Sequence, residues 1–326
     1  MMFKRNRFIG TGIIFLVVLF IAPLVLAQVG WHGGLSLFTR IVIYALAAVS
    51  LDLIIGYGGL VSFGHAMFFG TGGYVVAIIA FHTNTGQTLF GWEGSNSALI
   101  LWPLALLVCA ILGLITGYLA LKTRGVQFIM ITLAFAQMVY FVFVSLQYYG
   151  GDDGLMMDMR NTMPGIDLRD PWTFYYLVLG VLGIWVVFCR MVVNSRFGMV
   201  LQSLCQSEIR AVNLGINPVP FKLAAFVLSA VGTGLAGVLW ANYAEFTTPD
   251  MVAWTKSGEF MAIVTVGGLG TLLGPIAGTV VFIGLEQILA MWTEHWMIVM
   301  GLALVLIALF GQRGILGRFL KGNPHD

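Results

Sequence analysis

Long apolar segments follow one another along almost the whole chain, and they constrain its fold more than any other feature. Most have about 20 residues, the length of an α-helix that crosses the hydrocarbon core of a bilayer. Only 9% of the residues are charged, against roughly 25% in soluble domains. The sequence therefore predicts an all-α polytopic membrane protein with about ten transmembrane helices. The predicted spans are residues 8–27, 35–56, 62–81, 98–121, 126–148, 172–192, 221–243, 257–272, 273–292 and 296–311.

The first apolar segment admits two interpretations. Lys4, Arg5 and Arg7 precede it, as they would precede a cleaved signal peptide. However, residues 8–27 are longer than the apolar core of a signal peptide, which has about 7–15 residues. We therefore predict an uncleaved first helix.

The basic residues predict the orientation of the chain. If the N-terminus is cytoplasmic and residues 257–272 cross the membrane, 12 of the 16 lysines and arginines lie on the cytoplasmic side, as the positive-inside rule prefers. The short segment 257–272 is otherwise a broken helix or a re-entrant loop. The charge pattern favours a crossing, with both termini cytoplasmic and external loops at about 82–97 and 149–171.

Several classes of function are disfavoured by the sequence. No polar stretch is long enough for a soluble domain, so residues 1–326 form one transmembrane domain. The sequence contains no GxxxxGK[ST], HExxH or GxSxG pattern, and a net charge of +2 does not suggest nucleic acid. Cys109 and Cys189 lie in apolar runs and are expected to be packing residues. Asp152 and Asp153 lack the spacing of a calcium loop. We expect no catalytic residue, metal or cofactor in this chain.

One polar segment between two apolar runs is patterned. Within the loop at about 194–220, residues 201–216 read as an amphipathic helix on the cytoplasmic side, which Gly215 would end and Pro218 and Pro220 would keep from continuing. This helix either joins two spans or docks a separate cytoplasmic motor. Its apolar face would hold Leu201, Leu204, Cys205, Ile209, Val212 and Ile216, and its polar face Gln202, Gln206, Arg210 and Asn213.

Three stretches resemble permease subunits of ABC importers of branched-chain amino acids (LivM-type). They are "SEIRAVNLGINPVPFKLAAFVLSA", "LDLIIGYGGLVSFGHAMFFGTGGY" and "VGGLGTLLGPIAGTVVF". In this family the first stretch holds the coupling helix, which sits in a groove of the ATPase. Arg210 stands where the family usually has a small residue. The positions that the resemblance assigns to this contact are Glu208, Arg210, Ala211, Leu214, Gly215 and Ile216.

The resemblance implies a permease subunit of the bacterial inner membrane, with no catalysis of its own. Its partners would be cytoplasmic ABC ATPases, which bind the ATP, a second homologous permease subunit and a periplasmic substrate-binding protein. The resemblance favours a different chain as the second permease. The small-molecule cargo would be a branched-chain amino acid or, as in relatives, urea, an amide or a small organic acid.

Two glycine-interrupted apolar segments, 56–73 and 265–278, are candidates for the substrate pathway. Broken helices in both halves of a transporter point to its transport site, although the same glycines also permit close helix packing. His65 is expected either to be hydrogen-bonded between helices or to line the pathway. The candidate pathway residues are Ser62, Gly64, His65, Tyr74, Gly267, Gly268 and Glu286.

Four charged residues fall within the predicted spans or near their ends: Arg40, Asp52, Glu259 and Glu286. A charge at mid-membrane costs about 2.5–3.5 kcal/mol on insertion scales, so each is expected near a helix end in contact with water. Arg40 and Asp52 are separated by about 18 Å of helix and cannot pair with each other. If one of the four is central, Glu286 is the best functional candidate.

Two functions of other classes compete with the importer permease. An ion-coupled secondary transporter needs buried carboxylates or ion sites, and it leaves the pattern of residues 201–216 unexplained. An intramembrane enzyme needs clustered histidine and acidic residues, which the sequence does not suggest. The importer permease is therefore the preferred interpretation.

Overall fold

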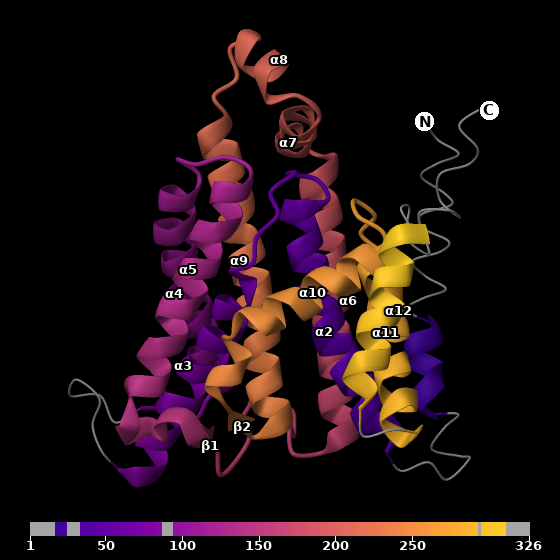
Figure 1. Ribbon diagram of the computed structural model, residues 1–326. Coiled ribbons are helices and arrows are strands. Elements are labelled where there is room, and N and C mark those ends of the chain that lie inside the picture. Colours follow the sequence, from indigo (N-terminus) through magenta and orange to yellow (C-terminus); the bar gives the residue numbers. More distant parts are fainter. Residues whose placement is uncertain (1–16, 25–32, 87–93, 293–294, 311–326) are drawn as a thin grey trace.

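The computed structural model describes residues 17–24, 33–86, 94–292 and 295–310, and residues 17–24 are helical. Long helices stand side by side in one bundle (Figure 1). The long helices are α2 (Gly34–Ile55), α3 (His65–Thr85), α4 (Ala98–Ala120), α5 (Val126–Ser145), α6 (Pro171–Asn194), α9 (Pro218–Ala244) and α11 (Gly274–Trp292). The shorter elements are α7 (Arg196–Gln206), α8 (Glu208–Asn213), α10 (Trp254–Gly267), α12 (Trp296–Phe310), the 3-10 helices η1 (Gln147–Tyr149), η2 (Gly151–Asp153) and η3 (Pro249–Met251), and the strands β1 (Leu155–Met156) and β2 (Phe246–Thr247).

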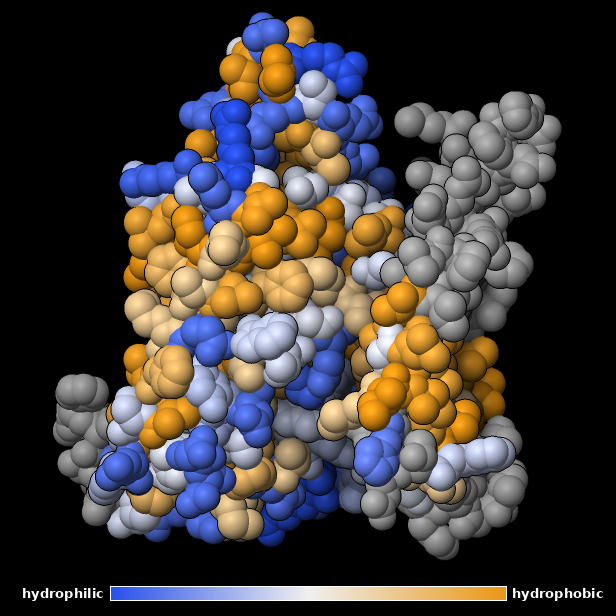
Figure 2. Space-filling view, viewed as in Figure 1, coloured by the Kyte–Doolittle hydropathy of each residue, from blue (hydrophilic) through white to orange (hydrophobic). Residues whose placement is uncertain are grey.

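Within the described residues, seven helices are long and apolar enough to cross a membrane. They are the seven long helices, and each coincides with a predicted span. Figure 2 shows apolar surface over much of the middle of the face in view, with hydrophilic surface at both of its ends. The prediction of an all-helical polytopic membrane protein is thus confirmed.

Three of the ten predicted spans are not established by helix length. Helices α10 and α12 have 14 and 15 residues, fewer than a bilayer core requires of a straight helix. The first predicted span is described only over residues 17–24. The predicted location of both chain ends concerns residues outside the described ranges.

Helix α2 occupies the centre of the bundle. Of an 18-residue apolar stretch of α2, 89% is buried inside the protein, whereas only 17% of the corresponding stretch of α5 is buried. A helix that is apolar on all sides suits a central position, because every face then meets another apolar surface. Its neighbours are α6, α9, α10 and α11.

Close packing between α3 and α9 depends on glycine. A Cβ atom on Gly237 would lie 1.8 Å from the carbonyl oxygen of Phe69, and one on Gly72 would lie 2.3 Å from that of Gly234. Small residues let helix backbones approach in a membrane protein, where helices gain little from the hydrophobic effect. The packing interpretation therefore holds for Gly72.

The backbone breaks in both glycine-interrupted segments. Helix α2 ends at Ile55, and residues 56–64 run without a helix until α3 begins at His65. The second break is the turn 268–273 between α10 and α11. Glycine is required there because Gly268 has φ of +110° and Gly270 has φ of +70°. Both predicted interruptions are therefore confirmed as breaks in helical structure.

Helices α3 and α10 both begin inside the bundle. The backbone N–H of Ala66 donates to the side-chain oxygen of Ser257 at 2.8 Å, which joins the first turns of the two helices. The neighbouring His65 reaches Ser229 near the middle of α9. This region therefore lies well away from both ends of α9.

The end of the bundle opposite α7 and α8 carries the short antiparallel pair β1 and β2 (Figure 1). Leu155 pairs with Thr247, and Met156 pairs with Phe246. This pair joins the connection between α5 and α6 to the connection between α9 and α10. It lies at the end of the molecule that the charge pattern predicts to be outside the cell.

Candidate functional site

Helices α7 and α8 project from one end of the bundle (Figure 1). They form two helices rather than the single one predicted over residues 201–216, so that prediction is wrong. Ser207 is extended, with φ of −163°, and its side chain accepts a hydrogen bond from the N–H of Arg210 at 3.4 Å. A serine oxygen that caps a new helix competes with continuation of the old one.

The predicted apolar face is divided at the same point. Leu201 and Leu204 of α7 are buried, while Ile209 of α8 is 74% exposed. Val212 and Leu214 are exposed as well. Leu201 and Leu204 therefore pack on the bundle, and Ile209, Val212 and Leu214 face outward at the tip.

The predicted end of the amphipathic segment is confirmed. Gly215 has φ of +84° and its N–H donates to the carbonyl of Val212. The N–H of Ile216 donates to the carbonyl of Ala211 at 3.1 Å. Pro218 then begins α9, where its fixed φ and missing N–H suit the first helical position.

The six coupling candidates fall into two groups. Glu208 and Ala211 face the protein, and Ala211 is only 3% exposed. The other four are exposed or half-buried at the tip. They are Arg210, Leu214, Gly215 and Ile216.

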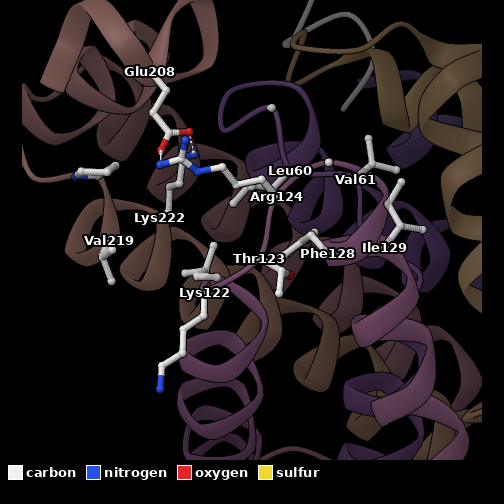
Figure 3. Close-up of a pocket in the computed structure, with 14 residues that line it drawn as sticks. Leu60, Val61, Lys122, Thr123, Arg124, Phe128, Ile129, Glu208, Val219 and Lys222 are labelled. Atoms are coloured by element: carbon white, nitrogen blue, oxygen red, sulfur yellow. Dashed lines mark hydrogen bonds and ion pairs between the residues drawn. The ribbon is translucent and has the colours of Figure 1, made fainter.

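Glu208 joins three parts of the chain. Its carboxylate accepts a hydrogen bond from Lys222 of α9 at 2.8 Å and forms an ion pair with Arg124, between α4 and α5, at 3.2 Å. Figure 3 shows both basic side chains converging on Glu208, while Lys122 points away. The hydrogen bond from Lys222 and the two positive charges hold the pKa of Glu208 below its usual value.

Lys222 and Arg124 were not among the residues singled out in the sequence. The available signal was Glu208 itself, a single acidic residue among the basic residues of the predicted cytoplasmic loops. Such a residue is expected to pair with one of them. Sequence spacing does not reveal which, because Arg124 lies on a different loop.

A pocket of about 430 Å³ lies beside this ion-pair cluster. The helix break after α2 contributes Gly59, Leu60 and Val61 to its wall, and Glu208 and Lys222 line another side. A Cβ atom on Gly59 would lie 3.0 Å from the sulfur of Cys205 in α7. The α7–α8 region therefore contacts the helix break directly.

Three pathway candidates form one buried cluster. The Nδ1 atom of His65 lies 3.0 Å from the hydroxyl of Ser62, which accepts from the N–H of Gly64 at 3.2 Å. The Nε2 atom of His65 lies 2.8 Å from Ser229, whose hydroxyl donates to the carbonyl of Ser50. Since the Ser229 proton is used, Nε2 carries the ring proton and Nδ1 accepts from Ser62. His65 is therefore hydrogen-bonded between helices.

The other pathway candidates lie apart from this cluster. Tyr74 is buried and stacks on Phe143, with ring centroids 4.0 Å apart. Gly267 and Gly268 end α10. Glu286 lies in α11 and pairs with Arg40 of α2.

Asp52 is not solvated, and that expectation is wrong. Its side chain is fully buried, and Oδ1 accepts a hydrogen bond from the N–H of Gly270 at 2.8 Å. The carboxylate thus satisfies a backbone donor in the turn 268–273, close to the end of α2. A buried carboxylate is tolerated where it meets a donor that would otherwise lack a partner.

Arg40 and Glu286 are also paired rather than solvated. The Arg40 guanidinium donates to both carboxylate oxygens of Glu286, at 2.7 and 2.9 Å, and so joins α2 to α11. Arg40 lies over the ring of Tyr44, with its Cζ atom 5.5 Å from the centroid. Lys256 lies over the same ring at 5.3 Å and donates to Glu259 at 2.7 Å.

The sequence analysis singled out Arg40, Glu259 and Glu286 of this set. It did not predict their pairings or the part of Lys256 and Tyr44. Lys256 and Glu259 could have been paired from their spacing, because residues three apart share a helix face. The partnership of Arg40 with Glu286 spans 246 positions and leaves no local signal.

The comparisons with known proteins all point to one family. Residues 34–308 match the family described as "Branched-chain amino acid transport system / permease component". The chain is 26% identical to the high-affinity branched-chain amino acid transport system permease protein LivM of Salmonella typhimurium, over 91% of this chain and 74% of the relative. It is 25% identical to the Escherichia coli protein of the same description, with the same coverage.

A more distant relative comes from an archaeon. The probable branched-chain amino acid transport permease protein LivM of Methanocaldococcus jannaschii is 22% identical over 76% of this chain and 78% of the relative. No solved structure gives a significant match. The family match covers most of the chain and all the contacts described above. The chain therefore belongs to the family of branched-chain amino acid transport permeases, and it is a multi-pass, non-catalytic membrane component of an ABC transport system.

Proposed function

We propose that this chain is one of two homologous permease subunits of an ABC importer in the bacterial inner membrane, and that α7 and α8 dock a cytoplasmic ATPase. The observation that carries the proposal is the projecting tip of α8. Ile209 and Leu214 are 74% and 81% exposed there, beyond the apolar surface of the bundle (Figure 2). Exposed apolar side chains outside the lipid region suit a protein partner.

A chain of contacts leads from this tip to the centre of the bundle. Glu208 bonds to Lys222, so a displacement of α8 acts directly on α9. Helix α9 carries Ser229, which holds His65 at the start of α3. Cys205 of α7 touches Gly59 in the helix break. Closure of the ATPases on ATP would therefore move the broken helices through α7 and α8.

The opposite end of the molecule suits a periplasmic binding protein. Between α5 and α6 the chain carries five aspartates and two arginines in residues 149–171. Arg160 pairs with Glu245 at 3.0 Å, which holds this loop against the end of α9. We infer that the binding protein delivers the cargo at this end.

The names of the three relatives support a branched-chain amino acid as the cargo in preference to urea, an amide or an organic acid. The family assignment also disfavours an ion-coupled transporter that works without an ATPase. Two permease chains would enclose the pathway, each contributing one coupling region.

The test is purification of the tagged chain from its native host in mild detergent, with identification of the proteins that accompany it. We expect an ATPase that carries GxxxxGK[ST], and we expect Leu214→Asp to abolish its recovery, because a charge would replace an apolar contact. Met156→Asp is the matched control, since Met156 is 74% exposed at the opposite end. If the chain is recovered alone and moves leucine in vesicles without ATP, the importer assignment is wrong.

A further inference from the structure

Two ion pairs flank one tyrosine near the middle of α2. The Cζ atom of Arg40 and the Nζ atom of Lys256 lie 5.5 and 5.3 Å from the ring centroid of Tyr44. Arg40 bonds to Glu286, and Lys256 bonds to Glu259. Both basic residues of these pairs therefore contact the same tyrosine, and the contacts join α11, α2 and α10.

These charges lie between the two ends of the bundle. Tyr44 stands at the midpoint of α2, and Ser257, next to Lys256, is hydrogen-bonded to Ala66 near the start of α3. Each charge at such a depth costs about 2.5–3.5 kcal/mol on insertion scales, and intramembrane charges commonly mark substrate pathways. The presence of both ion pairs at this depth therefore needs a physical explanation.

The pair of Arg40 with Glu286 has a structural reason. It joins two helices through two hydrogen bonds, and the side chains are only 26% and 15% exposed. Inter-helix hydrogen bonds of this kind hold membrane helices together. This pair needs no ligand to account for it.

The pair of Lys256 with Glu259 is different. Both residues belong to α10, and a pair three residues apart on one helix contributes only about 0.2–0.5 kcal/mol. The contact of Lys256 with Tyr44 adds roughly 0.5–2 kcal/mol, and a lysine in the first turn opposes the helix dipole. The Lys256–Glu259 pair itself joins no two helices, so it lacks the structural reason of the Arg40–Glu286 pair. Glu259 is moreover 38% exposed, so its carboxylate faces outward from the bundle.

Open space adjoins this pair. A Cβ atom on Gly258 would meet no heavy atom of the described residues within 4 Å. Ala262, one turn beyond, is half-buried and small. The accessible part of α10 therefore combines one positive charge, one negative charge and room for an apolar group.

We propose that Lys256 and Glu259 form a transit site for the zwitterionic backbone of a free α-amino acid. The Lys256 ammonium receives the carboxylate of the cargo, and the Glu259 carboxylate receives its ammonium group. The internal pair opens as two new pairs form, so the net charge of the site does not change. The apolar side chain of the cargo lies beside Gly258. This inference rests on the proposed importer function.

The test uses the complete importer in proteoliposomes, with uptake of radiolabelled L-leucine as the readout. Lys256→Met, Glu259→Gln and the double variant are each expected to lower uptake about tenfold or more, because a charge of the cargo then lacks its partner. A purely structural pair predicts another outcome. The double variant would recover, since it leaves no charge unpaired. Recovery of the double variant would overturn the proposal.

The matched control is Gly180→Leu in α6, where a Cβ atom also meets no described heavy atom within 4 Å. We expect it to retain leucine uptake once the importer is assembled. A second variant, Gly258→Leu, fills the open space and leaves both charges, and it is expected to reduce leucine uptake as well. Unchanged uptake by Gly258→Leu would contradict the position assigned to the cargo.

Two further readouts separate this inference from the proposed function. Recovery of the ATPase with each variant, and ATP hydrolysis stimulated by the leucine-loaded binding protein, report on assembly and coupling. If the unaltered chain recovers no ATPase, the importer function fails. If assembly and stimulation are normal and the Lys256→Met/Glu259→Gln variant transports at the original rate, the transit site alone fails.

Discussion

Glu208 makes the contacts that join α8 to the bundle, although the family resemblance assigns it to the ATPase contact. Its partners Lys222 and Arg124 belong to α9 and to the connection between α4 and α5. Lys222 is only 13% exposed, and a partly buried ammonium group loses more than an exposed one when its partner is removed. At this position the carboxylate anchors α8 to the rest of the chain.

Replacement of Glu208 by glutamine is expected to lower the free energy of unfolding by about 1 kcal/mol, because both ion pairs are lost and only a hydrogen bond from the Lys222 ammonium to an uncharged amide oxygen can remain. Thermal unfolding of the purified chain in detergent measures the change. Arg210→Gln is the control, since Arg210 is exposed on the same helix. Equal melting temperatures for the two variants would show that the Glu208 contacts contribute nothing.

The same carboxylate predicts a pH dependence. The pKa of Glu208 is held below its ordinary value of 4.5, so the folded state binds the proton less readily than the unfolded chain. The stabilisation is present above the ordinary pKa and is lost as pH falls through the lower folded value. The stability difference between the unaltered chain and Glu208→Gln should therefore be constant near neutral pH and shrink in acid. A difference that grows on acidification would contradict this sign.

At the scale of helices, features that depend on neighbouring residues could be predicted from the sequence, whereas contacts between residues far apart in the chain could not. The spans, the break before His65 and the stop at Gly215 follow from apolar length and glycine, which are local properties. The break at Ser207 was missed because serine both continues a helix face and caps a new helix. Asp52 and Gly270 are 218 positions apart, so only the fold reveals their contact.

Helix packing gives a prediction at this scale. Gly237→Ala is expected to destabilise the bundle by about 1–3 kcal/mol or more, because the new methyl group would meet backbone of Phe69 in α3 rather than a movable side chain. Thermal unfolding and folded yield are the measurements. Gly180→Ala in α6 is the matched control, where a Cβ atom meets no described heavy atom within 4 Å. A melting temperature for Gly237→Ala equal to that of the control would refute the close approach of α3 and α9.

For the whole molecule, the two ends of the bundle differ in charge. The end with α7 and α8 carries Lys122, Arg124, Arg190, Arg196, Arg210 and Lys222, with Glu208 among them. The opposite end carries most of the aspartates of residues 149–171. By the positive-inside rule, this asymmetry predicts that α7 and α8 lie in the cytoplasm. The ATPase assignment requires that orientation.

The chain contains its own reporter of orientation. Cys205 on α7 is exposed, whereas Cys109 and Cys189 are buried. A membrane-impermeant maleimide should therefore label the unaltered chain in inside-out vesicles and leave it unlabelled in intact right-side-out vesicles. The variant Cys205→Ser/Asp153→Cys should show the reverse, since Asp153 is exposed at the opposite end. Labelling of Cys205 from outside would invert the orientation, and the tip of α8 could then not reach a cytoplasmic ATPase.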